Sequence, residues 1–308
     1  MVIASLIIPT FNRTISLNAC INSILMSLVD NIEIIIVNDY KEGDVIIYDE
    51  NKSDIITIVN SPKKGVASAR NYGAHIAKSH NLIFIDDDMI LNKNAIITAI
   101  NFLETTTLEV YNADWVYEKH LLDKISKFQF GRYLIENKFT TLKGWNDGQI
   151  VWQENKLLES KSITSQFFAI KKIDFNTIGR YNENFPFAGF EDHDLSLKLN
   201  NHNIKISIDT RVLIFHNEID RLEPVKWLER KQRGAKTRKV AFEMGYHDLE
   251  LRYSRKKDLF YKLMIKTEPL LFFILKLIPN FKITDYLYFK LINILIGTYI
   301  YKGYKSIN

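Results

Sequence analysis

The sequence predicts an α/β fold in which a mainly parallel sheet carries helices on both faces. Apolar, β-branched runs alternate with segments of helical spacing over residues 2–104, and polar side chains follow the end of each run. Such alternation is typical of parallel strands, because each needs a crossover segment before the next. The 308 residues, 46% of them hydrophobic, suffice for one large domain or two ordinary ones.

Four short apolar runs are the predicted strands, at 2–8, 32–38, 55–59 and 82–85. Helical spacing of the apolar residues predicts helices at 14–28, 66–78 and 93–104. The later run 162–170 is predicted to return to the sheet as a strand. The apolar start of the chain lacks a basic leader and a cleavage site, which favours a buried strand over a signal peptide. The single cysteine, Cys20, favours a reducing compartment and a core position.

Polar residues stand at the carboxyl ends of the four predicted strands. They are Thr10 and Asn12, Asp39, Ser61 to Gly65, and Asp86 to Asp88. Because ligands of parallel sheets bind beyond these ends, we expect one crevice there. The chain has neither a Walker loop nor a GxGxxG motif. A nucleotide would therefore be held by an aspartate at a strand end and by a cation that neutralises its phosphates.

Two acidic clusters carry most of the chemical information. Asp86, Asp87 and Asp88 follow an apolar run, and Glu191 and Asp192 open a helix-like segment. Adjacent carboxylates repel one another, so the first cluster indicates a metal and phosphate site. The second cluster is predicted to be the place where the chemistry of this site happens. Its alternative interpretation is an acidic first helical turn that complements the helix dipole.

With these clusters, three further motifs resemble the family 2 glycosyltransferases of the GT-A fold. The motifs are Ile8–Arg13, Ile36–Asp39 and Gly65–Gly73, and the likeness spans residues 1–220 in family order. The resemblance implies a GT-A type nucleotide-binding sheet and an inverting, hexosyltransferase-type enzyme. It also implies a nucleotide-diphosphate sugar donor, commonly a UDP-sugar, and a Mn²⁺ or Mg²⁺ ion.

The resemblance also implies roles for single residues. Pro9, Thr10, Asn12 and Arg13 would line the nucleoside pocket, and Asp39 would bind the base. Gly65 would allow close backbone approach, and Arg70 matches a basic residue near the nucleotide. Asp86 is the first Asp of the DxD motif, and Asp87 would contact the ribose. Asp88 and His216 are the implied metal ligands, although a histidine after an apolar strand is often structural. Asp192 is the implied general base, and Glu191 orients the acceptor or the base. Asp194, two positions further on, is expected to cap the helix or to face solvent. Tyr40 and Lys41 depart from the Gly-Ser or Asn-Ser of many relatives.

The C-terminal part is basic and amphipathic. From Arg221 onward the chain has 19 Lys and Arg against 8 Asp and Glu, whereas the part before it has 22 against 28. The lysines interrupt apolar segments at 257–278 and 285–301, a pattern that favours a membrane surface over nucleic acid. A helical hairpin packed on protein, or a homo-oligomer contact, is the alternative. We expect a catalytic domain at 1–220, with a nucleotide-sugar-binding half at 1–104 and an acceptor half at 105–220, and a helical region at 221–308.

The predicted setting is bacterial surface-polysaccharide synthesis at the cytoplasmic side of the membrane, with a glycan or lipid-linked saccharide as acceptor. Tryptophans between residues 105 and 165 are candidates for the acceptor wall. Two alternatives stay open: a sugar nucleotidyltransferase and a non-catalytic sugar-binding relative. The first would need a glycine-rich basic loop after the first strand, and Pro9-Thr10-Phe11-Asn12 is not one.

Overall fold

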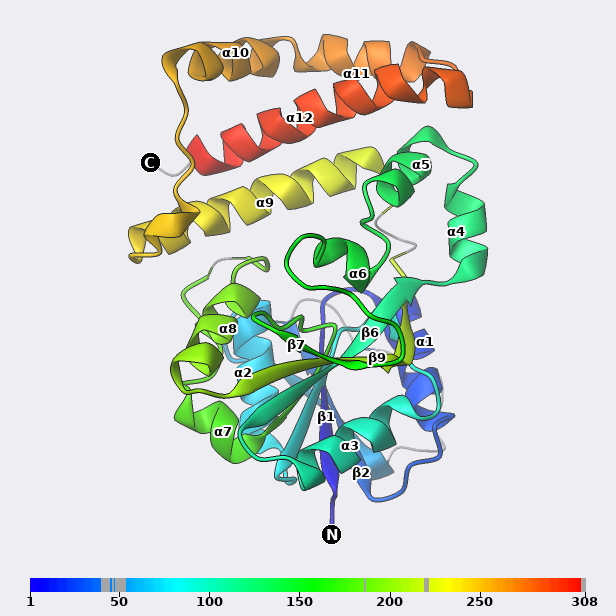
Figure 1. Cartoon of the computed structure of the whole chain (residues 1–308), viewed down its shortest axis with the longest axis vertical. Helices are drawn as coiled ribbons and strands as arrows, with labels where there is room; N and C mark the ends of the chain where they lie inside the picture. Colours follow the sequence, from blue (N-terminus) through cyan, green and yellow to red (C-terminus); the bar gives the residue numbers. More distant parts are fainter. Residues whose placement is uncertain (40–44, 46, 48–53, 186, 219–221, 306–308) are drawn as a thin grey trace. The chain divides into compact units, whose positions relative to one another are not determined.

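A computed structural model describes residues 1–39, 45, 47, 54–185, 187–218 and 222–305. Contacts divide the chain into two compact units (Figure 1). The sheet unit comprises Met1–Glu118, Thr141–Asn184 and Glu191–Asn217, and the helical unit comprises Lys119–Thr140, Phe185–Phe190 and Glu218–Asn308. Tyr40, Lys41 and the predicted domain boundary at 220/221 lie outside the described residues, so that boundary stays a prediction.

The sheet unit contains one sheet, which within the described residues has nine strands. In chain order they are β1 Ala4–Thr10, β2 Ile32–Asn38, β3 Ile56–Asn60, β4 Asn81–Ile85, β5 Met89–Ile90, β6 Glu109–Tyr117, β7 Leu157–Ser160, β8 Phe167–Lys171 and β9 Lys205–His216. Their order is β3-β2-β1-β4-β8-β6-β9-β5, and β7 pairs with β9. The strands β3, β2, β1 and β4 are parallel, whereas β8 runs antiparallel between β4 and β6.

Burial on both faces explains why the first strands are continuous apolar runs. Every residue of β1, β2 and β4 is buried. One face packs against α2 (Val66–Ile76), α7 (Lys172–Thr177) and α8 (Glu191–Asn201). Figure 1 shows α1 (Thr14–Leu25) and α3 (Ala95–Thr105) on the other side. The predicted α/β class with helices on both faces is confirmed, and Cys20 is buried in α1.

Gly73 lets α2 pack closely on the sheet. A Cβ atom at this position would lie 2.4 Å from Ile7 Cγ2 and 3.2 Å from Val37 Cγ2. We therefore expect Gly73→Ala to reduce the free energy of unfolding by about 1–3 kcal/mol through overpacking. Urea denaturation measures this change. The control is Gly234→Ala, because a Cβ atom at Gly234 would meet no other atom within 4 Å. This substitution should cost no stability.

The helical unit has its own apolar core. Its helices are α4 Lys119–Ile125, α5 Gln129–Glu136, α9 Pro224–Glu243, α10 Arg255–Lys266, α11 Glu268–Leu277 and α12 Asp285–Lys305, with short 3₁₀ turns η4 His247–Leu249 and η5 Lys282–Thr284. Side chains of α5, α9 and α12, among them Tyr133, Trp227 and Ile292, form the core. The predicted helical character of the C-terminal region is confirmed. Within the described residues, no helix combines the length and hydropathy that crossing a membrane requires.

Candidate active site

The carboxyl ends of β1 and β4 bring Thr10 and Arg13 to the first acidic cluster. Thr10 Oγ1 donates a hydrogen bond of 2.7 Å to Asp87 Oδ2, and Arg13 Nη1 contacts Asp87 Oδ1 and lies 2.9 Å from Asp88 Oδ2. Asn12, between them, has a φ of 51°, a left-handed conformation that asparagine tolerates. Asp87 and Asp88 are buried, so the Arg13 guanidinium offsets part of their charge.

Asp88 also meets His216, which ends β9. Met89 pairs with His216 in the antiparallel β5–β9 ladder, and this register sets His216 Nε2 3.3 Å from Asp88 Oδ1. The rings of Trp115 and Tyr117 contact the imidazole edge-on, with centroids 5.0 and 5.7 Å away. A buried carboxylate and an imidazole at this separation are a donor set that fits a divalent transition-metal ion.

Arg70 joins the two acidic clusters. From α2 its Nη2 lies 2.8 Å from Asp86 Oδ1, and its Nη1 lies 3.2 Å from Glu191 Oε1 and 4.0 Å from Asp192 Oδ1. Burial opposes its charge, yet the carboxylates, led by Asp86, raise the pKa of Arg70. Burial also raises the pKa of Asp86, against the lowering effect of Arg70. Residues some hundred positions apart in the sequence therefore share one guanidinium.

Asp192, in the first turn of α8, is held by a residue that the sequence did not single out. Ser165 donates its backbone N–H to Asp192 Oδ2 at 3.0 Å and its hydroxyl to Asp192 Oδ1. The Tyr181 hydroxyl lies 2.8 Å from Ser165 Oγ. Burial, and next the charge of Glu191, raise the pKa of Asp192 to about 7, while Arg70 and Ser165 lower it. A carboxylate with this pKa suits proton transfer near neutral pH.

Asp39 and Gly65 are joined by a hydrogen bond. Gly65 N donates to Asp39 Oδ1 at 2.7 Å, which links the end of β2 to the start of α2. Gly65 has a φ of 118°, a conformation that favours glycine. Pro9 lies in β1 beside Val37 of β2. The predicted nucleotide residues thus lie at neighbouring strand ends, and their contacts with a nucleotide stay predictions.

Three details differ from what the sequence suggested. Asp194 is buried and pairs with Lys198 at 2.8 Å, so the expectation that it faces solvent is wrong. Trp115 is a core residue, whereas Trp145 is 46% exposed. Ser165 is not among the predicted site residues, because the sequence predicts one strand over residues 162–170. The strand β8 begins only at Phe167, which leaves Ser165 in the preceding loop.

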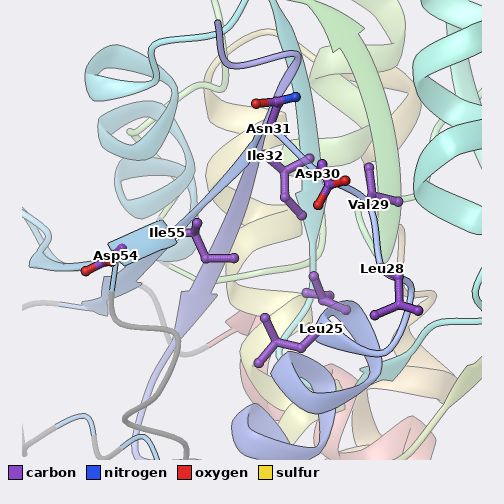
Figure 2. A pocket seen from close by; sticks show the side chains of 9 residues that line it. Leu25, Leu28, Val29, Asp30, Asn31, Ile32, Asp54 and Ile55 are labelled. Atoms are coloured by element: carbon purple, nitrogen blue, oxygen red, sulfur yellow. The ribbon is translucent and has the colours of Figure 1, made fainter.

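A separate pocket lies at the opposite ends of the strands. Figure 2 shows the side chains that line it, beside the starts of β2 and β3. Its volume is about 450 Å³. It is lined by Ile24, Leu25, Leu28, Val29, Asp30, Asn31, Ile32, Asp54 and Ile55. Because residues 28–32, 54 and 55 lie before or at the starts of β2 and β3, the pocket is separate from the acidic clusters at the carboxyl ends.

Comparison with known proteins identifies the family. The model of glycosyl transferase family 2 matches residues 5–163. An uncharacterized glycosyltransferase of Haemophilus influenzae is 26% identical over 195 residues, which are 63% of this chain and 61% of that protein. The UDP-Glc:alpha-D-GlcNAc-diphosphoundecaprenol beta-1,3-glucosyltransferase WfaP of Escherichia coli is 28% identical over 207 residues, covering 67% of this chain and 73% of WfaP.

Solved structures agree in fold. The mannosyltransferase PcManGT from Pyrobaculum calidifontis, in complex with GDP-Man and Mn²⁺, aligns with a TM-score of 0.56 at 12% identity, covering 99% of this chain and 88% of that one. GalNAc-T7 with UDP, GalNAc and Mn²⁺ aligns with a TM-score of 0.52 at 13% identity, covering 69% of this chain and 42% of that one. The sheet is therefore of the GT-A type, and the chain belongs to glycosyl transferase family 2.

Proposed function

We propose that the protein transfers a sugar from a nucleotide-diphosphate donor, most simply a UDP-sugar, to a hydroxyl group of a lipid-linked glycan, with inversion. The contact of Arg70 with both acidic clusters is the observation that carries this proposal, because it brings a phosphate and metal site next to a candidate base. The relative WfaP, whose name specifies UDP-Glc and a diphosphoundecaprenol-linked acceptor, supports the choice of donor and acceptor. The proposal includes a role in surface-polysaccharide synthesis.

In the proposed reaction, Asp192 accepts the proton of the acceptor hydroxyl. At the same time the oxygen of that hydroxyl attacks the anomeric carbon of the donor sugar. The bond from that carbon to the diphosphate oxygen breaks, and the diphosphate leaves with the electron pair. Asp88 and His216 would hold a divalent cation, which supplies Lewis-acid stabilisation of charge on the leaving diphosphate. Arg13 pairs with Asp87 and Asp88, and Arg70 pairs with Asp86 and Glu191, so the two arginines hold these carboxylates in place. Mn²⁺ fits this donor set better than Mg²⁺, which prefers oxygen ligands alone.

A thermal-shift screen tests the donor and the metal together. UDP-sugars with Mn²⁺ should raise the melting temperature, since a ligand at 100 times its Kd stabilises by about 2.7 kcal/mol. His216→Gln should weaken the dependence on Mn²⁺ but leave the unliganded melting temperature nearly unchanged. The proposal fails if no nucleotide sugar stabilises the protein with any divalent ion. Stabilisation without release of the nucleoside diphosphate would favour the non-catalytic alternative.

The contacts of Asp192 predict how activity depends on pH. As a base it must be ionised, so kcat/KM should rise with pH through about 7, the pKa of this carboxyl. The hydroxyl of Ser165 stabilises the ionised form, and its removal raises the pKa. Ser165→Ala should therefore shift the rising limb to higher pH, while Ser165→Thr should restore it. Glu191, Arg70 and Tyr181 remain in both variants. A uniform loss of rate with an unshifted limb would contradict this role.

A further inference from the structure

Helices α10 and α11 form an outer layer of the helical unit. Figure 1 shows them along one side of α12, with α9 along the other. Both helices lie entirely within the described residues, and of their side chains Leu275 alone is buried. Isolated helices of this length are marginal, so their contacts with α12 on one side hold them in place.

The inward side of this layer is polar and specific. Asp258 accepts a hydrogen bond of 2.6 Å from the Tyr301 hydroxyl, and Glu268 accepts one of 2.7 Å from the Tyr299 hydroxyl. Tyr261 packs where α12 has Gly297, since a Cβ there would lie 2.6 Å from the Tyr261 oxygen. These contacts fix which face of the layer points outward.

The outward side is apolar. We call it the outer apolar face, and its large side chains are each more than half exposed, from 52% for Leu287 to 90% for Ile283. Its members are Leu259, Leu263, Leu270, Phe273, Leu277, Phe281, Ile283, Tyr286 and Leu287. Leu270, Phe273 and Leu277 recur at helical spacing on one stripe of α11. Large apolar side chains exposed in this number on neighbouring elements indicate an interaction site.

The charges around this face are of one sign. Between residues 255 and 290 the chain has eight Lys and Arg against three acidic residues. Each of the three carboxylates is engaged in the unit: Asp258 with Lys262, Glu268 with Lys302, and Asp285 with Arg132. The lysines of this segment, by contrast, are exposed, at positions 256, 257, 262, 266, 276, 282 and 290. The accessible charge is therefore basic.

We propose that the outer apolar face docks on an anionic lipid surface, with α10 and α11 lying in the plane of the interface. Apolar side chains would enter the headgroup region, while lysines at the rim reach the phosphates through their aliphatic stems. A second copy of the same face is disfavoured, because pairing would oppose two basic surfaces. The inference does not depend on the proposed reaction, since the face belongs to the helical unit alone.

Vesicle sedimentation of the full chain tests the proposal. The protein should pellet with vesicles of phosphatidylcholine and phosphatidylglycerol, and less with phosphatidylcholine alone or at high salt. Phe273→Ser with Leu277→Ser should lower the bound fraction at least about tenfold. The control is Met26→Ser with Ile173→Ser, two similarly exposed residues of the sheet unit, which should bind as wild type does. Lys256→Gln with Lys266→Gln should weaken only the part of the vesicle binding that depends on phosphatidylglycerol.

Two further readouts decide between occupants. A tryptophan introduced as Phe273→Trp should shift its emission to the blue with anionic vesicles, as it leaves water. Light scattering should find the same mass for wild type and for the serine pair. A wild-type dimer that the serine pair converts to a monomer, or vesicle binding equal in the serine pair and its control, would overturn the proposal. None of these measurements depends on catalytic activity.

Discussion

Asp192→Asn is expected to lower kcat by about 10²–10⁴-fold and to leave donor affinity nearly unchanged. An amide cannot accept the acceptor proton, whereas its oxygen can still accept the hydrogen bond from the Ser165 hydroxyl. The substitution also removes a partly buried carboxyl whose pKa is raised to about 7, so folding should not suffer from lost charge. Release of nucleoside diphosphate measures the rate, and calorimetric titration measures donor binding.

The matched control is Asp194→Asn, on the same helix. Asp194 is equally an acidic residue of the first turn of α8, but its partner is Lys198. We expect this variant to keep its rate within a few-fold of wild type. Full activity in Asp192→Asn would remove Asp192 from the role of base. Equal losses in both variants would instead indicate that the acidic turn acts only through the structure of the helix.

Arg70→Met is expected to destabilise the protein by about 3–5 kcal/mol. It leaves the buried Glu191 and the partly buried Asp86 and Asp192 without the guanidinium that contacts all three. The methionine keeps most of the apolar stem, so little of this loss reflects packing. Urea denaturation should give a large decrease in the midpoint, and Arg70→Lys an intermediate one, because lysine cannot reach two carboxylates with a planar fork.

The pH dependence of this loss separates charge from packing. Arg70 lowers the pKa of Asp86 and of Asp192, so its contribution is full where these two carboxyls are ionised and shrinks as pH falls and they protonate. The difference from wild type should thus be smaller at acidic pH. Arg252→Met, whose partner Glu250 is at the surface, should cost at most about 1 kcal/mol. A loss for Arg70→Met that is small, or constant with pH, would contradict the linking role.

Much of the fold could be predicted because local pattern and burial agree. The run at 32–38 is β2 as predicted, since all seven residues are buried and a continuous apolar run is what such a strand requires. The helical tail was less predictable. The expected apolar segment 257–278 is two helices. Pro269 lies in the first turn of α11 and has no N–H with which to continue the hydrogen bonding of α10. The antiparallel insertion of β8 depends on contacts distant in sequence.

The site was predictable where residue type alone defines the chemistry. Clustered carboxylates such as Asp88 and Asp192 are rare enough to be noticed in a sequence. Ser165 gave no such signal, because its hydroxyl matters only through Asp192, which lies 27 positions away. For Asp194 the prediction is wrong. An acidic residue in the first turn of a helix is typical of an exposed helix start, yet Asp194 is buried beside Lys198. Such partnerships arise from tertiary packing.

An anomalous-scattering map of crystals grown with Mn²⁺ and UDP tests the central claim, that both acidic clusters serve one transfer site. The account predicts a manganese peak beside the Asp88 carboxylate and His216 Nε2, with the diphosphate bound to it and the Asp192 carboxylate facing the same crevice. Manganese and UDP bound away from Asp88, or Asp192 shut off from the bound diphosphate, would contradict it.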